Sequence, residues 1–119
     1  MTGTHVDLGV LLELLREAGA EEMLAEILQT FADEAPKCMR AVEDAAGEHH
    51  LESIRQAAHA YKSSARQIGA VQLGELLAAL EHSASEGSLE TALAMIDRVR
   101  QEHANVLEEL AAQAGSGSD

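Results

Sequence analysis

One histidine of this chain lies in a row of basic side chains spaced like one face of a helix. Arg55, His59, Lys62 and Arg66 follow one another at intervals of four, three and four residues, and Ser63 lies one turn beyond His59. Residues three and four apart are neighbours on a helix surface, and like charges at that spacing repel one another. Three of the eight Lys and Arg residues of an acidic chain share this row. The row therefore indicates a face that receives an anion.

Phosphoryl transfer on His59 is the chemistry that suits this arrangement. Imidazole has an ordinary pKa of about 6.5, so much of it is neutral at pH 7 and one ring nitrogen is free to attack phosphorus. Lys62 can donate to the phosphoryl oxygens from one turn away, while Arg55 and Arg66 attract the anion at longer range. A solvated helix face without chemistry is the competing interpretation of the row.

Helices must position this row, because the composition favours helix and gives a β-sheet few of its usual residues. Glycine commonly ends a helix, since it adopts the left-handed conformation without a Cβ clash. We expect helices to end at Gly19, Gly47, Gly69, Gly87 and Gly115. The predicted helices span about 4–18, 21–46, 50–68 and 71–86, and a fifth starts after Ser88.

Two local signals refine these predicted helices. Thr4 and Asp7 have the spacing of a capping box that would open the first helix. Pro36 lies inside the second helix and predicts a kink there, because proline removes one helical hydrogen bond.

The predicted fold is all-α, an antiparallel up-down four-helix bundle with an additional short N-terminal helix. Short connections between long helices make sequential neighbours antiparallel. In the third helix an apolar stripe of Leu51, Ile54, Ala58, Tyr61, Ala65 and Ile68 would face the core. We expect one domain over residues 1–114 and a Gly/Ser tail or linker over 115–119.

Charge and composition exclude several classes of protein. The formal net charge of -13 disfavours nucleic acid as a partner. Cys38 is alone in the chain, so it cannot form an intramolecular disulfide. No stretch has the pattern of a signal peptide or the length of a membrane span, so we expect a cytoplasmic protein without membrane insertion. A monomer is also expected, because no second apolar face is evident.

The segment that contains His59 resembles the histidine-containing phosphotransfer (HPt) domains of phosphorelays. Residues 58–70 read AHAYKSSARQIGA. This is similar to the family pattern of Ala-His, an apolar residue two positions later, Lys three positions later, small residues, and a closing Gly-Ala. Phe31, Pro36 and the Leu80-Glu81 pair also stand where similar chains have them, so the resemblance covers about 20–112.

The resemblance implies a phosphorelay intermediate that exchanges a phosphoryl group with the aspartate of response-regulator receiver domains. His59 would be phosphorylated at Nε2 and Lys62 would support the phosphoryl group. The partner would be a receiver domain, a hybrid histidine kinase, or both, and Mg²⁺ would belong to the receiver. The chain itself would need no cofactor, and without an ATP-binding domain it would be a phosphocarrier and not an enzyme.

Two further residues enter through the same resemblance. Ser63 stands where family members usually have Gly, so we expect it to alter contact with the partner, and Arg55 and Arg66 of the basic row are expected to contact the partner as well. Glu81 stands near the place of a polar residue that steadies the imidazole, and its carboxylate could hold Nδ1–H. An ordinary exposed glutamate is the equal alternative for Glu81.

Other functions remain open at this point. A metal site would use His49 and His50 with His59 or His82, but no spacing typical of a metal site supports it and we expect none. A kinase would need a Gly-rich phosphate loop, which the sequence lacks. The main alternative is a non-catalytic helical interaction module, a degenerate HPt domain in which His59 is incidental.

Overall fold

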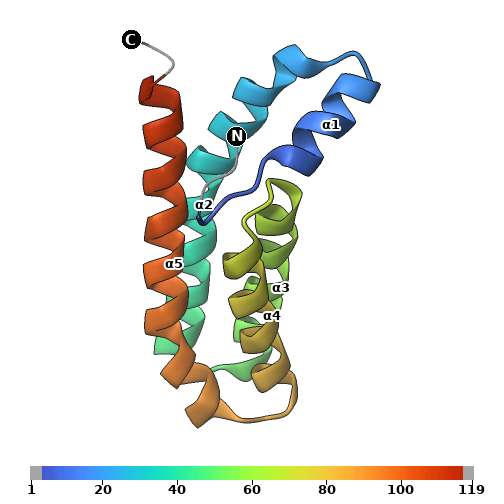
Figure 1. Ribbon diagram of the computed structural model, residues 1–119. Helices are drawn as coiled ribbons and strands as arrows, with labels where there is room; N and C mark the ends of the chain where they lie inside the picture. The colour runs from blue at the N-terminus through green and yellow to red at the C-terminus, as the bar shows by residue number, and fades with distance from the viewer. Residues whose placement is uncertain (1–3, 117–119) are drawn as a thin grey trace.

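The chain is helical along most of its length in the computed structural model, which describes residues 4–116 and side chains as far as 113. The elements are α1 (Gly9–Glu17), the 3-10 helix η1 (Glu21–Met23), α2 (Leu24–Gly47), α3 (Leu51–Gln67), α4 (Val71–Ser85) and α5 (Leu89–Ser116). Figure 1 shows α2 to α5 running up and down side by side, with α1 beyond one end of the bundle.

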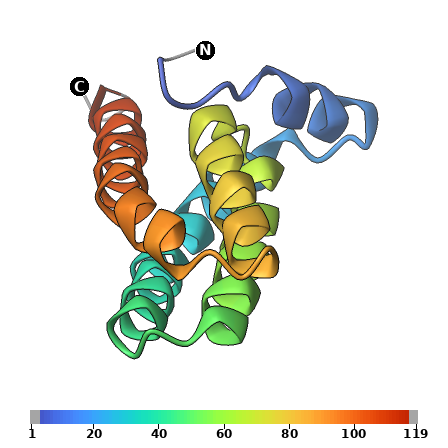
Figure 2. The same ribbon diagram turned by 90° about the horizontal axis from the view of Figure 1, so that it is seen from below.

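The four long helices form a closed ring of neighbours. Each of α2, α3 and α4 packs against the next helix, and α5 packs back against α2; the α3–α4 pair is the most extensive. The view along the bundle in Figure 2 shows the same ring, with α1 set outside it. The predicted all-α bundle with an additional N-terminal helix is therefore confirmed.

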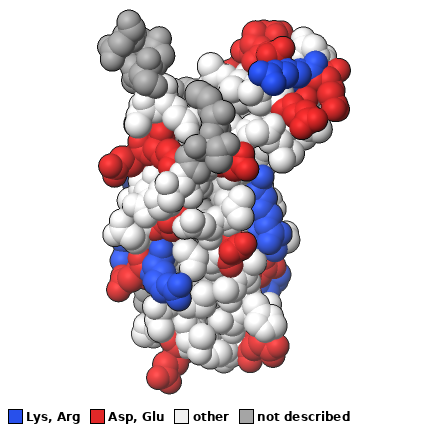
Figure 3. Space-filling model, viewed as in Figure 1, with Lys and Arg blue, Asp and Glu red and all other residues white. Residues whose placement is uncertain are grey.

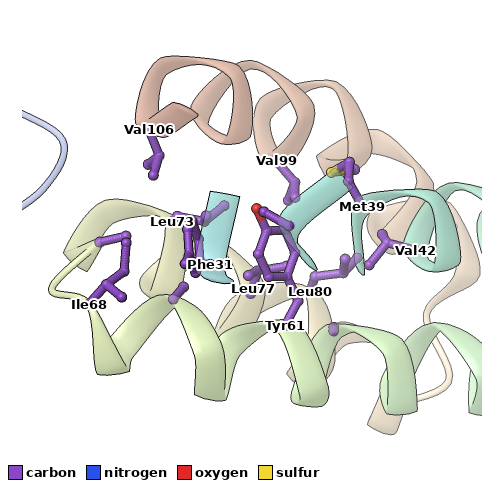
Figure 4. Packing of buried hydrophobic residues seen from close by; sticks show 14 of the residues in the cluster. Phe31, Met39, Val42, Tyr61, Ile68, Leu73, Leu77, Leu80, Val99 and Val106 are labelled. Carbon is purple, nitrogen blue, oxygen red and sulfur yellow. The ribbon is translucent and has the colours of Figure 1, made fainter. Parts of the chain in front are cut away.

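The apolar stripe of α3 faces the core as predicted. Ile54, Ala58, Tyr61 and Ala65 are all completely buried. Figure 4 shows the Tyr61 ring among residues from α2, α4 and α5. Burial of this stripe fixes the rotation of α3 about its axis, so the neighbouring row that contains His59 must face outward.

The predicted start of the first helix is wrong. α1 begins at Gly9, and its N-cap residue Leu8 makes no side-chain cap. The Asp7 carboxylate accepts a hydrogen bond from the backbone N of Gly9 at 2.9 Å, so no capping box joins Thr4 and Asp7. Residues 4–8 instead form a non-helical strap, which hydrogen-bonds to residues far away in the sequence.

Two of the five predicted glycine stops need comment. α2 ends at Gly47 as predicted, but the left-handed residue after it is His49, with a φ of 55°. α5 continues through Gly115 to Ser116, so part of the predicted 115–119 tail is helical, and 117–119 lie outside the described residues. Pro36 lies within α2 as predicted, and Figure 1 shows the first part of α2 inclined away from the direction of its second part.

The strap is anchored on both sides of the bundle. Asp7 N donates to the Gly69 carbonyl at 2.8 Å, in the turn between α3 and α4. At the other end the Glu109 carboxylate of α5 accepts from the backbone N of His5 at 3.1 Å and from that of Val6 at 2.8 Å. The strap thus connects α5 to the end of the helix that bears His59.

Gly69→Ala is expected to lower the free energy of unfolding by about 1–3 kcal/mol, because Gly69 has a φ of +80° and an added Cβ would lie 1.8 Å from the Asp7 carbonyl oxygen. Gly87→Ala is the matched control, since Gly87 has a φ of +78° and open space around it. Urea denaturation measures both. Equal losses in the two variants would show that the strap contact contributes nothing.

No helix among residues 4–116 is long and apolar enough to cross a membrane.

Candidate functional site

His59 lies on the outward face of α3, and local signals explain why the helix is formed there. The ring of His50 caps the first turn, with Nδ1 accepting from the backbone N of Ser53 at 3.2 Å. The helix ends two residues before Gly69, whose positive φ stops it. The side chain of His59 is 58% exposed, so a large partner can reach its ring.

The carboxylate of Glu81 connects His59 to Lys62. Glu81 projects from α4, with Oε2 3.0 Å from His59 Nδ1 and Oε1 2.7 Å from Lys62 Nζ. Lys62 and Glu81 have side chains only 17% and 20% exposed, so the ion pair between them is partly shielded from water. The structure therefore brings together three of the residues that the sequence singled out.

The ion pair with Lys62 holds the pKa of Glu81 below its ordinary value. The hydrogen bond to His59 acts in the same direction, while burial of the carboxylate acts against both. Glu81 is therefore ionised at neutral pH and can only accept at Nδ1. The proton of the neutral ring then resides on Nδ1, and the lone pair of Nε2 faces outward for reaction.

The prediction that the row is purely cationic and self-repelling is wrong. Arg55 is held on both sides of its guanidinium by Glu52, with Nε 2.9 Å from Oε1 and Nη2 2.6 Å from Oε2. Glu52 lies one turn earlier on α3, and the hydrogen bond from Arg55 lowers its pKa to about 2. Lys62 is likewise neutralised by Glu81.

Arg66 and Ser63 lie near His59 without joining this network. Arg66 is exposed two turns beyond His59, and no ion pair to it occurs among the described residues; its Cγ would lie 3.1 Å from a Cβ added at Gly74 of α4. Ser63 is exposed, and its Oγ donates to the carbonyl oxygen of His59 at 3.2 Å. Figure 3 shows Lys and Arg side chains along the flank formed by α3 and α4.

A family model described as the Hpt domain matches residues 26–113. This chain belongs to the Hpt domain family. The Hpt match spans α2 to α5 and contains His59, Lys62 and Glu81. Hpt proteins are phosphocarriers and not kinases, so the family places this chain among modules for phosphoryl transfer.

A solved Hpt structure supports the same assignment. This chain is similar to the crystal structure of histidine-containing phosphotransfer protein B (HptB) from Pseudomonas aeruginosa PAO1, with a TM-score of 0.84 and 28% sequence identity. The superposition covers 93% of this chain and 95% of that one. A search of curated protein sequences found no match.

Tyr61 anchors the core-facing side of the helix that bears His59. Tyr61 is completely buried, and its Oη lies 2.6 Å from Nδ1 of His103 on α5. Burial raises the pKa of Tyr61 and lowers that of His103, although Glu43 acts against the lowering at His103. Both side chains are therefore neutral at pH 7, and their hydrogen bond connects the core of α3 to α5.

The other histidines do not gather around a metal site. Among residues 4–116, no group of three or more His, Cys, Asp or Glu side chains is placed to hold a metal ion. His50 caps α3, and His82 of α4 pairs at 3.4 Å with Glu86, the residue just after the end of α4.

Two side-chain pairings of α3 were not predicted from the sequence. Glu52 lies three residues before Arg55, a spacing that allows a helical ion pair and could have been recognised. His103 could not have been paired with Tyr61 in this way, because the two residues are 42 positions apart.

Proposed function

We propose that this Hpt domain is a phosphorelay intermediate, in which Nε2 of His59 accepts a phosphoryl group from the aspartyl phosphate of a receiver domain and later donates it to another. The observation that carries the proposal is the shared Glu81 carboxylate, which holds Nδ1 of His59 and Nζ of Lys62 at once. A solvated helix face has no need of such a bridge.

In each step of the transfer, the bond that forms is matched by a bond that breaks. The Nε2 lone pair forms the N–P bond, the acyl O–P bond breaks, and the electron pair leaves on the aspartate carboxylate of the receiver. The proton on Nδ1 stays hydrogen-bonded to Glu81, and the negative charge of that carboxylate stabilises the positive charge that develops on the ring. Return of the phosphoryl group to a second aspartate reverses these steps.

Lys62 acts as the electrostatic support of the phosphoryl group. Its ammonium lies one helical turn from His59 and has three donors, of which Glu81 Oε1 takes one at 2.7 Å. The remaining donors can bond to phosphoryl oxygens and counter their charge. Mg²⁺ is expected on the receiver, where it would serve the acyl phosphate, and this chain would require no cofactor of its own.

The partner classes proposed are response-regulator receiver domains and hybrid histidine kinases, with which HPt domains in general interact. The exposed face of α3 beside His59 would be the contact surface. Arg66, the cation of the row without an ion pair among the described residues, is available to an acidic receiver surface. Arg55 is available only if it leaves Glu52.

A two-receiver relay tests the proposal. A receiver domain is labelled through its aspartate, mixed with this chain, and separated from it; the chain is then mixed with an unlabelled second receiver. We expect label on the chain after the first step and on the second receiver after the next. A chain that binds receivers, yet takes up no label from any of a panel, would instead be a non-catalytic interaction module.

Ser63→Phe is expected to slow transfer from the receiver by about tenfold or more, because a side chain forced into a packed interface costs about 1–3 kcal/mol. Ser63→Gly restores the usual residue of the family and is expected to transfer at least as fast as the wild type. Transfer rates under single-turnover conditions measure both, with circular dichroism to confirm that α3 is intact. Equal rates for Gly and Phe would show that bulk at position 63 does not matter.

A further inference from the structure

An apolar groove lies between α2 and α5, away from the face that bears His59. It encloses about 670 Å³, and no charged side chain lines it within the described part of the chain. Its floor is made by residues of the first half of α2 and the last part of α5, principally Leu24, Leu28, Ala32, Leu107, Leu110 and Ala111. All six are apolar, and several are only partly buried. The groove is therefore a surface on which apolar side chains meet solvent.

The course of α2 explains why this groove is open. Figure 1 shows the second part of α2 alongside α5, whereas the first part inclines away from α5 toward α1. Pro36 stands between the two parts of α2. Leu24 and Leu28 in the first part are only partly buried, whereas Met39 and Val42 further along α2 are buried.

Two acidic side chains and no basic ones lie beside the groove. Neither residues 24–36 of α2 nor residues 101–113 of α5 contain any Lys or Arg, and their remaining acidic side chains line a different pocket, are buried or are bonded to residues 5 and 6. Asp33 lies at the edge of the groove, where it accepts a hydrogen bond at 2.9 Å from Gln29, a lining residue. Glu108 is exposed on α5 three residues before the lining residue Ala111. An apolar floor with an acidic rim results.

We propose that this groove binds a basic amphipathic helix of a partner protein. Leucines spaced three and four apart on such a helix would pack on the floor, as in other helix-in-groove complexes. Its Lys and Arg residues would face the acidic rim, which gives complementarity of charge. His59 and Lys62 lie on α3 and Glu81 lies on α4, so this partner and a receiver domain can be bound at the same time.

A second copy of the chain is the less suitable occupant. Each copy carries a formal net charge of -13, and pairing groove to groove would bring two acidic rims together. The acidic rim attracts a basic helix but repels a second copy of the chain.

A designed peptide of about 18 residues tests the proposal, with Leu on one helical face and Lys on the other. Its fluorescence polarisation is measured against the wild-type chain, the groove variant Leu28→Gln with Leu107→Gln, and the rim variant Asp33→Lys with Glu108→Lys. The matched control is Val10→Gln with Leu14→Gln on α1, which removes two exposed apolar side chains outside the groove. A peptide with Glu in place of every Lys controls for charge.

We expect saturable binding of the Lys peptide that weakens by about tenfold or more in both the groove and rim variants, and is unchanged in the α1 control. Added salt should weaken binding of the Lys peptide to the wild-type chain, because salt screens the attraction between the charges. The rim residues are exposed, so the rim variant keeps the test valid even if the groove variant unfolds. Absence of binding, equal binding of the Glu peptide, or affinity unaffected by the rim variant would overturn the proposal. Dimerisation that the groove variant abolishes would also overturn it, because the occupant would then be a second copy.

Discussion

Lys62→Met is expected to slow phosphoryl acceptance by His59 by about ten- to a hundredfold, since a hydrogen bond from a charged donor contributes about 1.5–3 kcal/mol. Two effects act together. The phosphoryl group loses its nearest ammonium, and the Glu81 carboxylate, freed from its 2.7 Å ion pair, repels the incoming anion. Single-turnover transfer from a labelled receiver measures the rate.

Two control variants separate these effects from a general loss of charge. Lys62→Arg keeps a cation one turn from His59 and should retain most of the rate. Arg66→Met removes a cation two turns away that pairs with none of the described residues, and it should affect receiver association more than transfer. A Lys62→Met variant as fast as the wild type would show that Lys62 does not support the phosphoryl group.

Glu81→Ala is expected to slow acceptance by about tenfold or more, by analogy with the groups that orient metal-binding histidines, whose loss typically costs about 10- to 100-fold. The variant frees the imidazole to rotate and to place its proton on either nitrogen. Glu81→Gln is the matched control, since an amide oxygen can still accept from Nδ1–H although it carries no charge. We expect Glu81→Gln to recover much of the wild-type rate of acceptance. This result would show that Glu81 acts by positioning the His59 ring.

The lowered pKa of Glu81 predicts how the wild type and Lys62→Met depend on pH. The lowered pKa of Glu81 means that its ionised form stabilises the fold at pH values above the ordinary carboxyl pKa, and this stabilisation is lost as the pH falls through the lowered pKa. The wild-type rate should therefore show no titration of Glu81 between pH 5 and 8, roughly the range in which His titrates. In Lys62→Met the pKa of Glu81 should rise, which carboxyl NMR shifts would show. An unmoved pKa would contradict the ion pair.

Sequence patterns predicted the bundle well where interactions between residues close together in the sequence determine the structure. The ends of α3 follow from His50, which caps it, and from Gly69, which stops it, and its buried face follows from the spacing of Ile54, Ala58 and Tyr61. The start of α1 was missed because Asp7 is drawn into a hydrogen bond with Gly69, 62 residues away. No local signal reports such a contact.

The candidate site shows the same division between local and distant contacts. The row of His59, Lys62 and Arg66 can be read from helical spacing alone. The position of Glu81 against both His59 and Lys62 depends on how α4 is aligned against α3, which helical spacing cannot predict; only the family resemblance pointed to Glu81. Pairing with Glu52 and Glu81 also neutralises two of the three basic side chains, so the predicted repulsion along the row is absent.

The most direct test of the account is incorporation of label from a phosphorylated receiver into wild-type chain, His59→Gln and His82→Gln. His82 is a suitable control because it is exposed on α4 and outside the bridge that joins Glu81 to His59 and Lys62. The account predicts an acid-labile, base-stable phosphoryl group on the wild type and on His82→Gln, and none on a folded His59→Gln. Label retained on His59→Gln, or absent from all three proteins with every receiver, would contradict it.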